Sequence, residues 1–181
     1  MCGVLGYSTN PGTPFSMPLA DCLPYIKHRG PDDSGIYEDS DLGIGFAHTR
    51  LSILDTSHHG HQPMFSPNRK VALIFNGEIY NYRELRLELE SEKFTFAGNS
   101  DTEVLLNLYL SFRDTPDQIE LMLKKLNGIF AFALYDFERN TMLIVRDPFG
   151  VKPLYYASSS SGFLFASEIK ALWFLMHAQD K

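Results

Sequence analysis

The sequence holds only two cysteines, Cys2 and Cys22, among its 181 residues. Two thiols cannot build the framework of bridges that stabilises small secreted domains. We therefore expect free thiols and a cytoplasmic location. Cys22 falls on a predicted short helix, where we expect it to be a buried structural residue.

Long apolar runs and clusters of basic residues are also missing. No apolar stretch approaches the ~20 residues that a membrane-spanning helix needs. No apolar segment with a cleavage site follows a basic start, and the first basic residue is Lys27, so we do not expect a secretory signal. The net charge of −6 argues against nucleic-acid binding. We expect neither a membrane nor a nucleic acid as a partner.

Motifs for phosphate and metal binding are lacking as well. There is no G-x-x-x-x-G-K-[ST] loop, and Gly43 and Gly45 lack the third glycine and the following helix of a dinucleotide fingerprint. The run His58-His59-Gly60-His61 lacks the spaced ligands of a structural zinc site, and we expect it to belong to a mobile loop. The sequence predicts no cofactor and no metal for this chain.

The length fits one domain, and the order of predicted elements is strands, then helices, then strands. Because the helices are grouped rather than alternating with strands, the pattern favours an α+β fold. We expect the last four strands to form one antiparallel meander. The predicted strands are 2–8, 43–53, 71–75, 129–135, 142–145, 154–157 and 163–166, and a closing helix covers 168–176.

Three helix starts follow the capping-box spacing, in which the cap residue is followed three positions later by Glu or Gln. Pro116 would take the favoured first helical position of the third helix. The pairs are Asn81 with Glu84, Ser100 with Glu103, and Thr115 with Gln118.

What the sequence does contain is a cysteine directly after the initiator methionine. Removal of Met1 would leave Cys2 with both a thiol and a free α-amine, whose pKa is roughly 7.7–8.0. That amine can take the thiol proton, so one residue would hold a nucleophile and its base. Position alone favours another interpretation, in which Cys2 begins an edge strand and packs as a small hydrophobe.

A thiol that attacks a carbonyl needs donors for the developing oxyanion. Asn76-Gly77 follows the buried run 71–75, and glycine there would let a backbone N–H approach a ligand closely. The same dipeptide is the commonest two-residue hairpin turn. Residue type alone gives the two interpretations equal weight.

Charged residues for substrate binding are present too. Arg50 ends a predicted strand and could bind a carboxylate bidentately, although an exposed salt bridge is the simpler expectation. Asp101 follows the cap Ser100 and could bind an ammonium group with Glu78. The alternative for Asp101 is complementation of the helix dipole.

Together these residues resemble the glutaminase domain of class II glutamine amidotransferases, in the asparagine synthetase branch. The resemblance covers essentially the whole chain, and its strength lies in the joint order of motifs that are individually weak. The motifs are Met1-Cys2-Gly3, His28-Arg29-Gly30-Pro31-Asp32, His48-Thr49-Arg50-Leu51-Ser52-Ile53, Gln62-Pro63-Met64, Phe75-Asn76-Gly77-Glu78-Ile79-Tyr80-Asn81, Ser100-Asp101-Thr102-Glu103, Phe130-Ala131-Phe132-Ala133, Arg146-Asp147-Pro148-Phe149-Gly150 and Ala166-Ser167-Glu168-Ile169-Lys170.

The resemblance implies an N-terminal nucleophile hydrolase fold, a four-layer αββα sandwich of two antiparallel sheets. It implies that Cys2 attacks the side-chain amide of glutamine and forms a γ-glutamyl thioester. Asn76 and the Gly77 N–H would form the oxyanion hole. Arg50 would bind the substrate carboxylate, and Glu78 and Asp101 its ammonium group. The segment 61–64 would cover the glutamine pocket.

The resemblance also implies what the chain works with. Residues 2–181 would be a glutamine amidotransferase type 2 domain that passes ammonia to a synthetase domain or subunit, with a homodimer left open. ATP and Mg²⁺ would belong to that synthetase part, which is absent here, and the chain itself would use no cofactor. Two other functions stay open: amidation of another acceptor, such as a sugar or natural-product carboxylate, and a non-catalytic module that binds glutamine or a partner.

Overall fold

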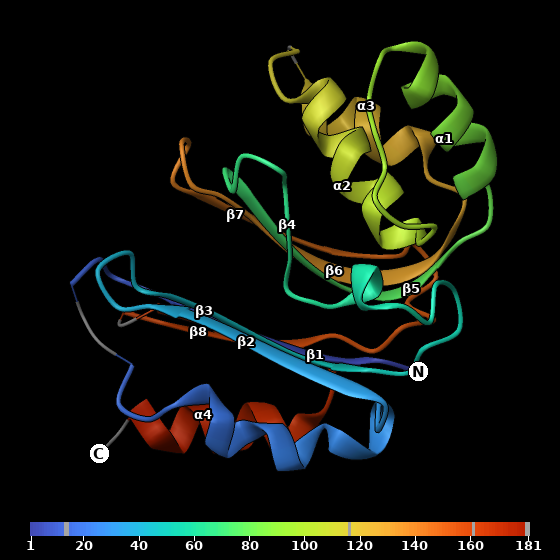
Figure 1. Ribbon diagram of the computed structural model, residues 1–181. Coiled ribbons are helices and arrows are strands. Elements are labelled where there is room, and N and C mark those ends of the chain that lie inside the picture. Colours follow the sequence, from blue (N-terminus) through green and yellow to red (C-terminus); the bar gives the residue numbers. More distant parts are fainter. Residues whose placement is uncertain (13–14, 116, 161, 180–181) are drawn as a thin grey trace.

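Two antiparallel sheets lie face to face between two layers of helices (Figure 1). The computed structural model describes residues 1–12, 15–115, 117–160 and 162–179. The arrangement confirms the expected α+β fold with four αββα layers. The N-terminus lies at one end of the sandwich, near the ends of β1 and β5 (Figure 1).

The first sheet has five strands and carries the N-terminus on its central strand. Its outer face is covered by the 3-10 helices η1 (Leu19–Tyr25) and η2 (Lys27–Arg29) and by α4 (Ile169–Gln179). Cys22 is fully buried in this layer, as expected. In spatial order the strands are β2 (Asp33–Asp39), β3 (Ile44–Arg50), β1 (Gly3–Thr9), β9 (Gly162–Ala166) and β8 (Tyr155–Ser159).

The second sheet has four strands, and its outer face packs against α1 (Tyr82–Ser91), α2 (Asp101–Phe112) and α3 (Gln118–Lys125). A short 3-10 helix, η3 (His58–Gly60), precedes its first strand. In spatial order the strands are β4 (Met64–Phe65), β5 (Val71–Ile79), β6 (Gly128–Asp136) and β7 (Thr141–Arg146).

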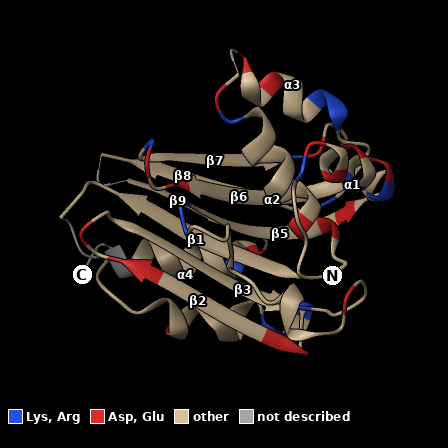
Figure 2. Ribbon diagram, turned by 45° about the horizontal axis from the view of Figure 1, so that its top comes forward, with Lys and Arg blue, Asp and Glu red and all other residues tan. Residues whose placement is uncertain are grey.

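An apolar core fills the space between the sheets. Successive strand residues point to opposite faces, so even-numbered residues of β1, β3 and β5 face this space, as Val4, Phe46 and Ile74 do. Charged residues gather on helices, loops and strand ends, and the middles of the strands are uncharged (Figure 2). This alternation of side chains between the two faces of a strand also determines which polar side chains point into the space between the sheets near the ends of β3 and β5.

The expected four-strand meander is wrong, because the four strands belong to two sheets. β6 and β7 pair in the second sheet, whereas β8 and β9 pair in the first. The chain crosses over after Asp147, whose carboxylate accepts N–H bonds from Phe130, Phe149, Val151 and Lys152 at 2.9–3.3 Å. These bonds hold a compact turn that redirects the chain, and turn composition alone does not distinguish it from a hairpin.

Two of the three predicted helix caps differ from expectation. Ser100 does cap α2, accepting from the Glu103 N–H at 3.2 Å. Asn81 precedes α1, but its side chain bonds the backbone of Lys125 and Asn127 and does not cap.

The third cap lies elsewhere because Thr115 remains tied to the end of α2, donating its N–H to Phe112 O at 2.9 Å. α3 begins only after Asp117, whose φ of 55° is left-handed. Pro116 lies outside the described residues.

Candidate active site

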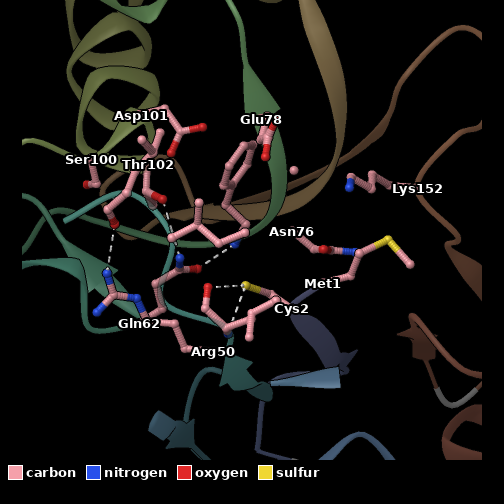
Figure 3. Close-up of a pocket in the computed structure, with 15 residues that line it drawn as sticks. Met1, Cys2, Arg50, Gln62, Asn76, Glu78, Ser100, Asp101, Thr102 and Lys152 are labelled. Atoms are coloured by element: carbon pink, nitrogen blue, oxygen red, sulfur yellow. Dashed lines mark hydrogen bonds between the residues drawn. The ribbon is translucent and has the colours of Figure 1, made fainter. Parts of the chain in front are cut away.

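A cavity of about 120 Å³ opens at the end of the sandwich where β1 begins (Figure 3). All six residues that the sequence singled out border it: Cys2, Arg50, Asn76, Gly77, Glu78 and Asp101. They come from both sheets and from the start of α2, so only the folded sandwich brings them together.

Cys2 directly precedes β1, and its sulfur points at the residue that follows β3. The Leu51 N–H donates to Cys2 Sγ at 3.4 Å, and the thiol lies 3.8 Å from Leu51 O. β1 is a central strand of its sheet, so the expectation of an edge strand is wrong. Met1 lies at the rim of the same cavity and is about half exposed.

Burial raises the pKa of the Cys2 thiol above its ordinary value, and the Leu51 N–H and the Arg50 charge offset this only in part. The sulfur is therefore protonated at neutral pH. Nucleophilic attack by Cys2 requires a base that removes its proton.

Asn76 lies within a continuous strand, so the hairpin-turn alternative for Asn76-Gly77 is wrong. β5 runs on to Ile79, with Asn76 opposite Ala131 and Gly77 opposite Phe130 on β6. As an even-numbered residue, Asn76 faces the space between the sheets and is 1% exposed. Its Nδ2 is buried and has no acceptor among the described residues. A buried amide donor without a partner is available to a ligand.

The Gly77 N–H points away from the β5–β6 ladder. Its partner across the ladder, Phe130, bonds Asp147 with both its N–H and its C=O, so Gly77 and Phe130 do not bond each other. A Cβ at Gly77 would come within 2.7 Å of Phe130 Cα, so only glycine fits here.

The N–H groups on either side of Gly77 along this edge are already bonded. Phe75 N donates to Gln62 Oε1 at 2.7 Å, and Ile79 N donates to Asp101 Oδ2 at 3.0 Å. The Gly77 N–H lies between them, and the described residues offer it no acceptor. With Asn76 Nδ2 it forms a pair of open donors at the cavity.

Arg50 is the last residue of β3 and is 6% exposed. Its guanidinium donates to the carbonyls of Ser57 at 3.1 Å and Leu54 at 3.2 Å, and to that of Asp55. The expected surface salt bridge is therefore wrong: this arginine is buried, and its described partners are backbone oxygens. These hydrogen bonds hold segment 51–57 against the guanidinium at the wall of the cavity.

Asp101 begins α2 but does more than complement the helix dipole. The residue is 5% exposed, and its Oδ2 accepts the Ile79 N–H. Burial raises the pKa of Asp101 to about 6, and the negative charge of nearby Glu78 acts in the same direction. In Figure 3 Asp101 and Glu78 lie on one side of the cavity and Arg50 and Cys2 on the other. The cavity thus presents both charge signs.

Gln62 and Lys152 also line the cavity, and neither was singled out individually from the sequence. Gln62 is buried, donates to Thr102 Oγ1 at 3.3 Å and accepts from Phe75 N, so it forms part of the cavity wall. Lys152 is 8% exposed and follows the turn that Asp147 holds. In the sequence, only the motif Gln62-Pro63-Met64 pointed to Gln62. Only the turn composition at 147–150 pointed to the neighbourhood of Lys152.

Within the described ranges, no three His, Cys, Asp or Glu side chains lie together as a metal site would require. Of the run His58–His61, His61 Nδ1 lies 2.7 Å from Asp33 Oδ2, and the His58 and His59 ring centroids lie 4.0 Å apart with the rings tilted by 40°. None of the described helices is long and apolar enough to cross a membrane.

Comparisons with known proteins converge on one family. The model of the glutamine amidotransferase domain matches residues 1–181. Asparagine synthetase [glutamine-hydrolyzing] 1 of Bacillus subtilis is 46% identical over 147 residues, which are 81% of this chain and 22% of that protein. Putative asparagine synthetase [glutamine-hydrolyzing] 1 of Methanocaldococcus jannaschii is 35% identical over 194 residues, covering 97% of this chain and 34% of that protein.

A solved structure gives the same result for the fold. The glutamine phosphoribosylpyrophosphate amidotransferase of B. subtilis, complexed with ADP and GMP, superposes with a TM-score of 0.74 at 26% identity. The match covers 97% of this chain and 44% of that one. The chain therefore spans less than half the length of each of these relatives.

Proposed function

This chain belongs to the glutamine amidotransferase domain family, and we propose that it hydrolyses the side-chain amide of glutamine through a γ-glutamyl thioester on Cys2. The observation that carries the proposal is the composition of one cavity. A protonated thiol, two open N–H donors and charges of both signs border it. Each of these corresponds to one requirement of amide hydrolysis on an amino-acid substrate.

The reaction begins when Met1 has been removed. The α-amine of Cys2 takes the thiol proton, directly or through a water, and Sγ attacks the amide carbon of glutamine. Asn76 Nδ2 and the Gly77 N–H stabilise the resulting oxyanion. The ammonium of Cys2 then protonates the leaving nitrogen, and ammonia departs. Water, activated by the same amine, cleaves the thioester to glutamate and restores the thiol.

Binding of glutamine as a zwitterion uses the two sides of the cavity. Arg50 donates some of its N–H groups to the carbonyls of segment 51–57, and its remaining N–H groups bind the substrate carboxylate. Asp101 and Glu78 bind the α-ammonium group. These contacts would place the side-chain amide between Sγ and the two donors, which favours the reaction by orientation.

Residues 1–181 match only part of each of these relatives. Because the matched relatives named as asparagine synthetases are far longer, we propose that residues 2–181 form a glutaminase domain that serves an ATP-dependent synthetase domain or partner in the cytoplasm. ATP and Mg²⁺ belong to that part, and no cofactor acts in this one. The relatives' names favour asparagine synthesis over another acceptor. The assembled thiol and donors disfavour a non-catalytic glutamine-binding module.

Glutamate release from glutamine tests the proposal. The protein lacking Met1 should turn over, whereas C2A and any form that retains Met1 should not. C22A is the matched control, because Cys22 belongs to η1 and is buried in the outer layer with residues of α4. Calorimetric binding of glutamine by the Met1-free protein without turnover would favour the non-catalytic module instead.

A further inference from the structure

Strand β5 loses its outer neighbour before it reaches the cavity. β4 is only two residues long, and its pair nearest the cavity joins Met64 to Leu73. If the ladder continued by two residues on each strand, the backbone of Gln62 would lie opposite that of Phe75. It ends before that point, so the backbone groups of β5 that face this edge need partners other than a strand.

Side chains bond the backbone of Phe75 instead. Its N–H donates to Gln62 Oε1 at 2.7 Å, and its carbonyl oxygen lies 3.1 Å from Nε2 of His48, which comes from β3 of the opposite sheet. All three residues are buried. Asn76 and Gly77 follow directly, so the Gln62 amide holds β5 immediately before the two open donors.

The other end of the Gln62 amide reaches α2. Nε2 donates to Thr102 Oγ1 at 3.3 Å, and Thr102 directly follows Asp101. Asp101 in turn accepts the Ile79 N–H at 3.0 Å, so the helix start and the end of β5 are joined a second time. One buried side chain thus connects the strand that carries the open donors to the helix start that carries the Asp101 carboxylate.

The length of this connection matters for a substrate that is held at both ends. In the proposed complex, Asp101 binds the ammonium group of glutamine, and Asn76 and Gly77 bind the oxygen of its side-chain amide. The two binding regions lie on different elements, α2 and β5. Their separation must match the distance between the two ends of the substrate, because catalysis by orientation tolerates only small displacements.

We propose that Gln62 is a positioning residue that fixes the separation between the oxyanion donors of β5 and the ammonium-binding carboxylate of α2. The inference rests on the proposed glutaminase function. Its two bonds should affect different kinetic parameters. Displacement of β5 beside Asn76 misaligns the donors in the transition state and lowers kcat, whereas displacement of Asp101 weakens substrate binding and raises KM.

Three variants separate the two bonds from general stability. Q62M has a side chain of similar length without the amide, so it breaks both bonds. T102V replaces one hydroxyl by a methyl group and leaves the bond between Gln62 and Phe75. S66A is the matched control, because Ser66 Oγ accepts the Val71 N–H at 3.0 Å at the opposite end of β5, away from the cavity.

Glutamate release and the unfolding midpoint are measured for each variant in the Met1-free protein. We expect Q62M to lower kcat about 100-fold, the size of loss that small misplacements of reacting groups produce. T102V should raise KM for glutamine about tenfold, as for weakening of one charged hydrogen bond, with kcat nearly unchanged. S66A should lower the unfolding midpoint and keep both kinetic parameters.

Combination with N76A asks whether Gln62 acts through the oxyanion donors. If it does, adding Q62M to N76A should lower kcat much less than adding it to wild type, because two residues that act together give non-additive effects. A full 100-fold loss in both backgrounds would contradict the inference.

Three further results would overturn the proposal. They are a wild-type kcat in Q62M, a wild-type KM in T102V, and a loss of kcat in S66A that equals the loss in Q62M at an equal unfolding midpoint.

Failure of the glutaminase proposal looks different, because the wild-type protein itself then releases no glutamate. The positions of the donors can still be followed by nuclear magnetic resonance. Q62M should shift the signals of the Gly77 N–H and of the Asn76 side-chain amide, whereas S66A should leave them in place. Unchanged signals in Q62M would contradict the positioning role whatever the activity.

Discussion

Asn76 faces the interior between the two sheets from β5, and it borders the same cavity as Cys2, which precedes β1 of the opposite sheet (Figure 3). Neither sheet alone forms the site. The buried layer between the sheets, which includes Val4, Phe46 and Ile74, sets the separation of the two residues. The proposed reaction and the packing of the two sheets therefore depend on the same buried layer.

Replacement of Asn76 tests the oxyanion role. Because its Nδ2 is buried without an acceptor, N76A removes a donor that no described residue uses. We expect kcat for glutamine hydrolysis to fall about 10²–10³-fold, as for loss of an oxyanion donor, with much less change in KM. Steady-state glutamate release measures both. A kcat within twofold of wild type would rule out this role for the side chain.

Replacement of Asp101 should separate binding from stability. Burial raises the pKa of Asp101 to about 6, so its ionised form is disfavoured in the folded protein, and its contribution to stability falls as pH rises through about 6. D101N should remove this cost at pH 8 and stabilise the fold by on the order of 1–3 kcal/mol, while KM for glutamine rises.

Urea unfolding and kinetics at pH 5.5 and pH 8 measure the two effects. Wild-type KM should itself rise as pH falls below about 6, because the protonated Asp101 no longer attracts the ammonium group. An unchanged KM in D101N at pH 8 would contradict the binding role.

Replacement of Gly60 by alanine should displace the Arg50 side chain while residue 50 itself remains arginine. A Cβ there would lie 1.8 Å from Arg50 Nη2. We expect G60A to displace the guanidinium and raise KM for glutamine at least about tenfold, the effect of weakening one charged hydrogen bond. R50K should act in the same direction. If G60A folds and binds glutamine normally by calorimetry, Arg50 does not bind the substrate carboxylate.

His48 should make the fold sensitive to acid. It is fully buried, its Nε2 lies 3.1 Å from Phe75 O, and burial lowers its pKa to about 3. Its stabilising contribution is complete above the unfolded pKa of about 6.5 and is lost progressively as pH falls toward 3.

Between pH 7.5 and pH 5 this one group should cost about 2 kcal/mol of unfolding free energy. H48Q has no such titration, so its stability should vary less over that range, as measured by urea unfolding. Equal pH dependence in H48Q and wild type would show that His48 is not the group responsible.

The residue types of the site were predictable, but their surroundings were not. Capping at Ser100 places Asp101 at a helix start, and the apolar run 71–75 predicts a strand before Asn76. Sequence could not show that β5 continues to Ile79, because Asn-Gly fits a turn as well as a strand. It is the register with β6 that leaves the Gly77 N–H open.

Long-range contacts explain the other differences. Arg50 bonds backbone carbonyls of a segment that has no periodic pattern, so an exposed salt bridge was the simpler expectation. The division of the late strands between two sheets depends on how Asp147 folds its turn. The bonds of Gln62 to Phe75 and Thr102 likewise follow from long-range packing and not from any local signal.

The central proposal, that Cys2 is an N-terminal nucleophile, is tested most directly by the intact mass of the mature protein before and after an electrophilic glutamine analogue. We expect a mass lacking Met1 and a single γ-glutamyl-type adduct on Cys2, together with loss of glutamate release. C2A should remain unmodified. A protein that lacks Met1 and forms no adduct at Cys2 would contradict the proposal.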